Sequence, residues 1–239
     1  MKALILNSGM GSRMEKYTQD TPKCMVSLLD GKTIIERQLE LLVAVGVQEA
    51  VITTGFLADK LRSFVESLET PMKVSFVHND RYDSTNYIYS MYLAGDCLEG
   101  DILLLHGDLV FEQSILEEML AQKQSCMAVS TACAIPEKDF KAVVREGKIL
   151  KIGIEFFENV VAAQPLYMIK SELWKAWKKK MEEFYQADQL TCYAENALNE
   201  ILVDYSLVPF DYGQRLCQEV DRKEDLQMVR KALENEKVY

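Results

Sequence analysis

The sequence predicts an α/β fold class: a three-layer sandwich in which helices cover both faces of a mostly parallel, mixed β-sheet. The first observation is that short apolar runs alternate with amphipathic stretches of helical length, which is typical of parallel sheets covered on both faces. The second is the 49% hydrophobic content of the 239 residues, which suffices for a substantial core. We therefore expect a single domain over residues 1–239.

Four apolar runs in the first half of the chain predict strands, and the run that ends at His106 is the most apolar of them. Between these runs, apolar residues such as Ile35, Leu39 and Leu42 recur at helical spacing, and Gly46 closes the first such stretch. The predicted strands are residues 4–6, 50–54, 73–78 and 101–106, and the predicted helices are residues 33–45, 57–68, 86–98 and 114–122.

The pattern changes in the second half, where short β segments follow one another and Glu146-Gly147 predicts a hairpin turn between two of them. We interpret this half as a β-rich elaboration of the same domain. The boundary near residue 110 separates residues 1–110 from residues 111–239. The further predicted strands are residues 128–134, 141–145, 149–154, 160–169 and 215–220, and the further predicted helices are residues 173–185, 196–203 and 223–235.

The composition argues against several classes of function. A net charge of −10 and a pI near 4.9 argue against a nucleic-acid partner, because proteins that bind the phosphate backbone usually present a basic face. Six cysteines are scattered without a Cys-x-x-Cys pair, which argues against a zinc site and a disulfide framework. The sequence has no signal-peptide pattern and no apolar run of roughly 20 residues, so we expect a cytoplasmic protein without a membrane partner.

A loop with two glycines follows the first predicted strand and favours a triphosphate ligand. Gly9 and Gly11 let backbone N–H groups approach phosphate oxygens closely, and Arg13 and Lys23 add fixed positive charge. The spacing lacks the Gly-Lys-Ser/Thr step of the Walker loop and the third glycine of the dinucleotide fingerprint. Kinase-like and NAD-binding sites are therefore disfavoured.

The segment from Leu6 to Met14, followed by Thr21-Pro22-Lys23, resembles the signature of nucleotidyltransferases that join a nucleoside triphosphate to a sugar phosphate or similar phosphomonoester and release pyrophosphate. The resemblance implies a Rossmann-like fold, and it implies that Arg13 and Lys23 are catalytic because they neutralise the triphosphate. It further implies that the nucleotide is bound by the loop and these two cations, namely Leu6, Asn7, Ser8, Gly9, Met10, Gly11, Ser12, Arg13 and Lys23.

Two aspartates at the ends of predicted strands are the candidate metal ligands. Asp108 follows Gly107, and Asp221 ends a Glu-Val-Asp step; in the resembled family, aspartates in such steps coordinate Mg²⁺. Carboxylate oxygens suit this hard cation, which would stabilise the charge that builds on the leaving pyrophosphate. Each aspartate could instead be a turn or helix-capping residue. The reaction needs no general base, so direct catalytic roles are not expected for His78 and His106.

The segment from Asn79 to Asn86 resembles the Asn-x-x-Tyr-x-x-x-Asn segment of the cytidylyltransferase branch, which includes bacterial choline-phosphate and aminoethylphosphonate cytidylyltransferases. This resemblance implies CTP as the nucleotide, with Asn79, Thr85 and Asn86 as further binding residues; Gly107, in the Gly-Asp step before Asp108, is another candidate nucleotide-binding residue. Side-chain amides can pair with a base edge or with a phosphate oxygen. Thr85 or Asn86 could instead cap the helix that follows.

The acceptor-binding part departs from the choline-phosphate pattern. Tyr193-Ala194-Glu195 resembles the family's Tyr-Trp-Asp/Glu segment, but Ala194 lacks the ring that would hold a quaternary ammonium through cation–π attraction. The candidate acceptor-binding residues are Tyr82, Gln164, Tyr193 and Glu195, and a cage could be rebuilt from Tyr82, Tyr167, Tyr193, Phe156 and Phe157. The candidate acceptors are phosphocholine, aminoethylphosphonate, phosphoethanolamine, phosphorylated amino acids and sugar 1-phosphates.

The sequence therefore predicts a Mg²⁺-dependent enzyme that transfers a cytidylyl group from CTP to a small phosphomonoester or phosphonate and releases pyrophosphate. Two alternatives stay open: a nucleotidyltransferase that makes a nucleotide sugar from UTP, GTP or dTTP, and a regulator that binds nucleotide without turnover. The joint presence of Arg13, Lys23, Asp108 and Asp221 argues against the regulator. A homodimer stays open as the oligomeric state.

Overall fold

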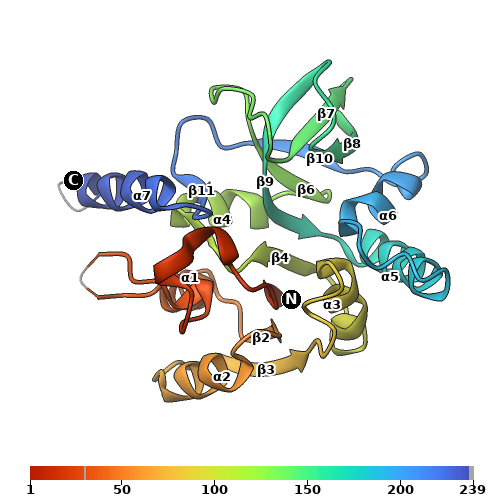
Figure 1. Cartoon of the computed structure of the whole chain (residues 1–239). Helices are drawn as coiled ribbons and strands as arrows, with labels where there is room; N and C mark the ends of the chain where they lie inside the picture. Colours follow the sequence, from red (N-terminus) through yellow and green to blue (C-terminus); the bar gives the residue numbers. More distant parts are fainter. Residues whose placement is uncertain (30, 237–239) are drawn as a thin grey trace.

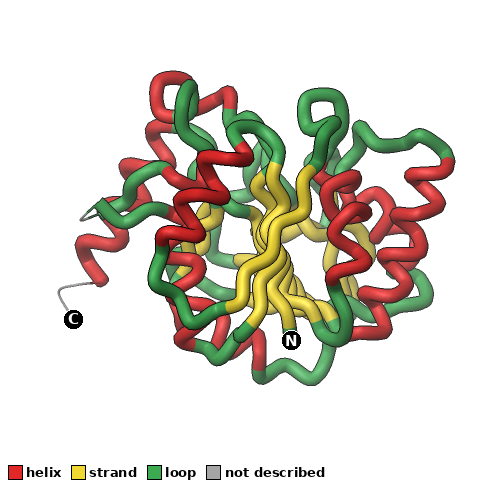
Figure 2. The backbone as a smooth tube through the Cα atoms, turned by 90° about the horizontal axis from the view of Figure 1, so that it is seen from below, coloured by secondary structure: helices red, strands yellow, loops and turns green. Residues whose placement is uncertain are grey.

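The structure is a computed structural model that describes residues 1–29 and 31–236, with the side chains of Ser12, Glu15, Lys16 and Glu236 excluded. In this part of the chain, nine strands form one sheet and two further strands form a small second sheet. Helices cover both faces of the large sheet (Figure 1 and Figure 2). The predicted α/β three-layer fold class is therefore confirmed.

The strands of the large sheet are β1 (Lys2–Asn7), β2 (Glu49–Thr54), β3 (Lys73–His78), β4 (Ile102–His106), β6 (Cys126–Ser130), β7 (Lys141–Arg145), β8 (Lys148–Gly153), β9 (Val160–Ile169) and β10 (Val208–Asp211). Their order is β10-β6-β9-β4-β1-β2-β3, with β7 joined to β9 and β8 joined to β7. β9 is antiparallel to β4 and β6, whereas β4, β1, β2 and β3 are parallel to one another. The small sheet pairs β5 (Leu109–Phe111) with β11 (Cys217–Glu219) in antiparallel fashion.

The helices are α1 (Ile34–Ala44), α2 (Ala58–Ser67), α3 (Tyr87–Ala94), α4 (Gln113–Leu120), α5 (Ser171–Gln186), α6 (Ala194–Ile201) and α7 (Lys223–Glu236), with short 3₁₀ helices at Ser12–Tyr17, Lys23–Met25 and Gly95–Cys97. Successive residues of β1 face opposite layers: Leu4 packs in the core under α3, α5 and α6, and Ile5 packs in the core under α1, α2 and α4. This double burial explains why the strand is a continuous apolar run.

The predicted Glu146-Gly147 hairpin turn is confirmed, since β7 and β8 pair on either side of it and both residues have positive φ, +52° and +73°. The strand predicted over residues 128–134 instead ends at Ser130, because the Ser130 hydroxyl accepts hydrogen bonds from the backbone N–H groups of Ala132 and Cys133. The helix predicted over residues 86–98 ends at Ala94 and continues as a 3₁₀ turn.

Two strands escaped sequence-based prediction. β5 has three residues, and β10 contains Pro209, a residue that normally argues against a strand and is confined to edge positions. β10 does lie at the edge of the large sheet. The two predicted halves of the chain share that sheet, because β9 pairs with β4. Among the described residues, no helix is both long enough and apolar enough to cross a bilayer.

Candidate functional site

A cavity of about 380 Å³ lies where the loops after β1, β3 and β4 meet. The segment before β7 and the residues around the end of β11 complete its wall. Its position matches the general preference of ligands for the carboxyl ends of parallel strands. The predicted site residues that line this cavity are Leu6, Asn7, Ser8, Gly9, Gly11, Arg13, Lys23, Asn79, Tyr82, Thr85, Asn86, Asp108, Tyr193 and Asp221.

Other predicted residues lie elsewhere. Met10 is exposed to solvent and is not part of the cavity wall, and the side chain of Ser12 lies outside those that the structure describes. Gly107 lies behind the wall, against Asn7. Gln164 is also outside the wall and interacts with the Tyr212 hydroxyl.

The loop after β1 has one position that requires glycine. Gly11 has φ +62°, and a Cβ on it would lie 3.1 Å from Lys23 Cβ, so any other residue would be strained and crowded. The Thr18 hydroxyl and the Met14 N–H both donate to the Gly11 carbonyl, at 2.8 and 3.0 Å. These contacts fix the loop beside Lys23. A Cβ on Gly9 would meet no atom within 4 Å, so sterics do not require glycine at this position.

Lys23 lies between the two predicted metal ligands. Its Nζ donates to Asp108 Oδ2 at 2.5 Å and also contacts Asp221 Oδ1, while Arg13 binds Asp221 Oδ2 at 2.6 Å. The Lys23 and Asp108 side chains are only 13% and 19% exposed. Burial opposes the charge on Lys23, but the attraction of the two carboxylates outweighs it and raises the lysine pKa above its ordinary value. Lys23 therefore stays protonated at neutral pH.

Asp108 is held in place by the turn that carries it. The buried Gln38 of α1 donates through Nε2 to the carbonyls of His106 and Leu109, at 2.9 and 2.7 Å, on either side of this turn. The Val220 N–H donates to the Asp108 carbonyl at 3.0 Å and joins the turn to the end of β11. The structure thus brings together two aspartates that are far apart in the sequence.

Gly107 packs directly against Asn7, and replacing it by alanine should destabilise the fold. The new Cβ would lie 1.6 Å from Asn7 Oδ1, and the turn cannot easily move because the Gly107 N–H donates to the Leu6 carbonyl at 3.0 Å. We expect Gly107→Ala to lower the free energy of unfolding by about 1–3 kcal/mol in urea denaturation. Gly9→Ala is the matched control, and equal unfolding midpoints for the two variants would contradict the expectation.

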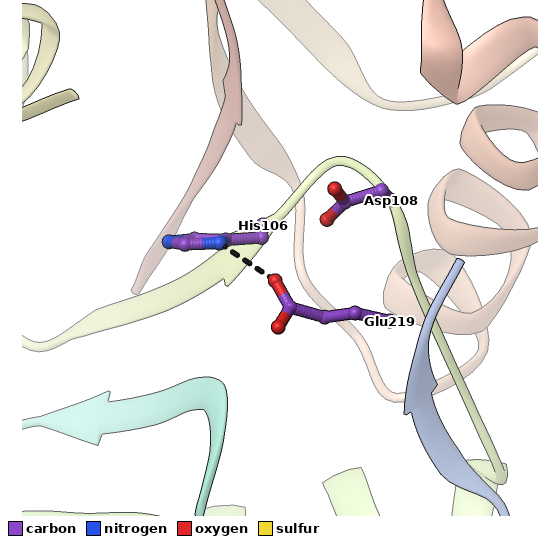
Figure 3. Close-up of side chains that lie close together, drawn as sticks. All are labelled: His106, Asp108 and Glu219. Atoms are coloured by element: carbon purple, nitrogen blue, oxygen red, sulfur yellow. Dashed lines mark hydrogen bonds and ion pairs between the residues drawn. The ribbon is translucent and has the colours of Figure 1, made fainter. Parts of the chain in front are cut away.

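His106 and Glu219 lie beside Asp108 (Figure 3). His106 Nδ1 is 3.1 Å from Glu219 Oε1, and one ligand atom from each of the three residues lies within 4.8 Å of the others. Burial opposes protonation of the imidazole, but the hydrogen bond to Glu219 outweighs it and raises the His106 pKa. Sequence reasoning gave Glu219 no role of its own. The sequence did contain a signal for such a role. Glu219 precedes the predicted metal ligand Asp221 by two residues, and in extended chain this spacing puts two side chains on the same face.

The carboxylate set fits a hard divalent cation. Asp108 Oδ1 is buried and has no hydrogen-bond partner among the described residues, which is costly unless a ligand supplies one. The oxygen donors of Asp108, Asp221 and Glu219 are those that Mg²⁺ prefers. The ammonium of Lys23 occupies the space between two of these carboxylates.

The segment between β3 and α3 is fixed by its own polar groups. Asn79 is buried and donates to the hydroxyls of Thr85 and Ser90 at 3.1 and 3.0 Å, while its oxygen accepts from the Arg81 N–H. Asn86 caps α3, as its Oδ1 accepts from the Tyr87 N–H. The capping alternative for Asn86 is thus realised, and both amides still line the cavity.

Aromatic rings form one wall of the cavity. Tyr193 lies 5.0 Å from Phe140 and 5.8 Å from Tyr87, measured between ring centroids, and all three rings belong to the lining. Tyr87 and Phe140 are additions to the predicted cage. Phe156 and Phe157 are not in the lining; they lie over Lys151 and Lys141 instead.

Glu195 does not reach the cavity, so the structure does not bear out a direct contact with the acceptor. Its carboxylate is buried and accepts from the Tyr87 and Tyr167 hydroxyls, the latter at 2.7 Å. Burial and the neighbouring carboxylate raise the pKa of both tyrosines, which therefore stay protonated donors. Glu195 supports the cavity wall from behind, through Tyr87.

Comparison with known proteins identifies similar chains. A family model described as MobA-like NTP transferase domain matches residues 3–189. CTP:phosphoglutamine cytidylyltransferase of Campylobacter jejuni is 29% identical over 160 residues, which are 64% of this chain and 62% of that protein. 2-Aminoethylphosphonate cytidylyltransferase of Lancefieldella rimae is 35% identical over 109 residues, which are 45% of this chain and 43% of that protein.

The fold has counterparts among solved structures. CTP:phosphocholine cytidylyltransferase from Streptococcus pneumoniae superimposes with a TM-score of 0.79, covering 97% of this chain and 98% of that chain, at 19% sequence identity. This likeness concerns the fold. The sequence matches to the two curated relatives span 43% and 62% of their lengths.

Proposed function

The chain belongs to the family of MobA-like NTP transferase domains, and from this premise we propose that it transfers a cytidylyl group from CTP to a small phosphomonoester or phosphonate. In this reaction an ionised oxygen of the acceptor attacks the α-phosphorus of CTP. The bond from the α-phosphorus to the bridging oxygen breaks, and pyrophosphate leaves with that oxygen. The acceptor oxygen carries no proton at neutral pH, so no side chain has to remove one.

The observation that carries the proposal is the charge arrangement at the cavity wall. The loop at Gly11, the cations of Arg13 and Lys23, and the carboxylates of Asp108 and Asp221 meet at one cavity. In a protein of net charge −10, these two cations supply local positive charge for a triphosphate. Transfer of a phosphoryl-type group relies mainly on such positioned charge.

Asp108 and Asp221 would hold Mg²⁺ in this proposal. When bound, the ion would neutralise charge on the triphosphate and on the departing pyrophosphate. Lys23 would then turn some of its three N–H donors from the carboxylates to phosphate oxygens of the triphosphate. Arg13, the more exposed of the two cations, would bind the phosphates nearest to solvent.

The acceptor would lie against the ring wall of Tyr87, Phe140 and Tyr193, next to the charged side chains of Lys138 and Asp139. The names of the relatives include phosphoglutamine and 2-aminoethylphosphonate as acceptors. Both contain an amino group, and an ammonium can be held by ring faces as well as by carboxylates. We therefore propose an acceptor that bears an amino or ammonium group rather than a sugar 1-phosphate.

The proposal predicts pyrophosphate release when the protein is given Mg²⁺, CTP and the correct acceptor. The assay panel contains phosphocholine, phosphoethanolamine, 2-aminoethylphosphonate, phosphorylated amino acids and glucose 1-phosphate, each tested with CTP, UTP, GTP and dTTP. We expect turnover with CTP and one amine-bearing acceptor, and loss of turnover when the metal is chelated. Turnover with UTP and glucose 1-phosphate would replace the proposal with a nucleotide-sugar synthase, and CTP binding without turnover across the panel would favour a regulator.

A further inference from the structure

Lys141, the first residue of β7, is a charged residue that is fully buried, with 0% of its surface exposed. Its backbone is fixed in the sheet, where it pairs with Gly153 of β8 and Ala162 of β9. A lysine at the start of a strand usually extends its ammonium into water, because burying that charge is costly. Its burial here therefore calls for a specific set of partners.

The partners of Lys141 are backbone carbonyls of the segment that precedes it. Its Nζ donates to the carbonyls of Pro136, Glu137 and Asp139 at 2.9, 3.3 and 3.1 Å. The ring of Phe157 lies 4.3 Å from the same nitrogen, a distance at which the ring face attracts a cation. The ammonium thus uses all three donors on one short segment and is covered by an aromatic ring.

The same segment, residues 136–140, forms part of the cavity wall. Lys138, Asp139 and Phe140 line the cavity, and Phe140 packs edge-on against Tyr193 at 5.0 Å. The segment belongs to no helix or strand; the Phe140 carbonyl accepts from the Ala163 N–H of β9, whereas the carbonyls of residues 136–139 have no strand partner and need other donors. Lys141 supplies donors to three of these carbonyls, while Lys138 and Asp139 of the same segment line the cavity.

We propose that Lys141 is a positioning residue that holds residues 136–140 in the conformation that receives the acceptor. The inference rests on the proposed cytidylyl transfer and assigns the acceptor side of that reaction to this segment. Without the ammonium, the three carbonyls would turn to water and the segment would lose its fixed shape. The acceptor would then have to order the segment on binding, which weakens its affinity.

The triphosphate loop is held by different contacts. Gly11 is fixed by Thr18 and Met14, and Lys23 is fixed by Asp108 and Asp221. Loss of the Lys141 ammonium should therefore act on the acceptor and leave the nucleotide unaffected. This separation is what the experiment tests, because general damage to the fold would weaken both substrates.

The experiment measures steady-state kinetics of Lys141→Met with CTP and the best acceptor of the panel described above. Methionine has nearly the length of lysine and keeps the buried position apolar. We expect the acceptor KM to rise about tenfold or more, as three hydrogen bonds from a charged donor are lost, while the CTP KM stays within about twofold of wild type. Lys151→Met is the matched control, since Lys151 lies on β8 opposite Val143, is exposed, and has a ring 5.8 Å away.

A second variant covers the case in which Lys141→Met does not fold. Phe157 is 62% exposed, so Phe157→Ala should fold, and removing one ring–cation contact should raise the acceptor KM about two- to fivefold. The proposal would be overturned if the acceptor KM is unchanged in both variants. If Lys141→Met does not fold, an unchanged acceptor KM in Phe157→Ala alone would overturn it. A rise in the CTP KM that parallels the rise in the acceptor KM would also overturn it. Absence of turnover by the wild-type protein across the panel would overturn both this proposal and the proposed function. That outcome differs from one in which the wild-type protein turns over and only the role of Lys141 fails.

Discussion

Lys23→Ala is expected to abolish pyrophosphate release from CTP, with a fall in turnover of about a thousandfold or more. The side chain is the most buried cation of the charge cluster and contacts both Asp108 and Asp221. Its removal takes away positive charge where the reaction develops negative charge, and Arg13, the other cation of this cluster, already binds Asp221. The measurement is the initial rate of pyrophosphate release at saturating CTP and acceptor.

Lys32→Ala is the control for this variant, because Lys32 forms an exposed ion pair with Glu40 away from the cavity. It should keep wild-type turnover. Urea denaturation should show that Lys23→Ala remains folded, so that loss of activity is assigned to the site. Turnover near the wild-type rate in the folded variant would contradict the role assigned to Lys23.

The charge cluster offers a readout that does not depend on activity. The Lys23 ammonium lies between the carboxylates of Asp108 and Asp221, where we propose that Mg²⁺ binds. Lys23→Ala leaves this carboxylate pair without that cation. Addition of Mg²⁺ alone should therefore raise the melting temperature of the variant more than that of wild type. An equal or smaller rise in the variant would indicate that the ion binds elsewhere.

The sequence allowed prediction of those parts of the site that depend on strand ends. Asp108 follows β4 of the parallel sheet, and ligands bind at the carboxyl edge of such sheets. Asp221 follows β11 of the small antiparallel sheet, whose pairing with β5 and the Val220–Asp108 backbone hydrogen bond bring it to the same place. The motifs therefore identified both aspartates as candidates, whereas their contact through Lys23 depends on the pairing of distant strands.

The parts that escaped prediction depend on contacts between distant segments. Lys141 resembles any lysine at a strand start, and only the path of the preceding segment places carbonyls around its ammonium. Glu195 was a candidate acceptor-binding residue, yet its carboxylate accepts hydrogen bonds from hydroxyls of α3 and β9. A one-dimensional pattern contains no signal for the direction of a buried side chain at a helix start. Such directions are fixed by packing of elements that are far apart in sequence.

Glu195→Ala is expected to cause a large loss of stability, because this buried residue joins three elements. The carboxylate at the start of α6 is 1% exposed and accepts from Tyr87 of α3 and Tyr167 of β9. Alanine would leave the hydroxyls of the buried Tyr167 and the half-buried Tyr87 without this acceptor and would open a cavity beside them. We expect the free energy of unfolding to fall by about 2–5 kcal/mol, which corresponds to a drop in melting temperature on the order of 10 °C for a chain of this size.

Three further variants separate this network from a general effect of removing a glutamate from α6. Glu200→Ala, on the same helix but at an exposed ion pair with Lys180, should change stability by less than about 1 kcal/mol. Glu195→Gln should be milder than Glu195→Ala, since its amide oxygen still accepts from one tyrosine. In a double-mutant cycle, Tyr87→Phe should cost less stability in the Glu195→Ala background than in wild type, because the hydroxyl it removes has already lost its partner. Equal costs in the two backgrounds would mean that Glu195 stabilises the protein through packing and not through the tyrosine hydroxyls.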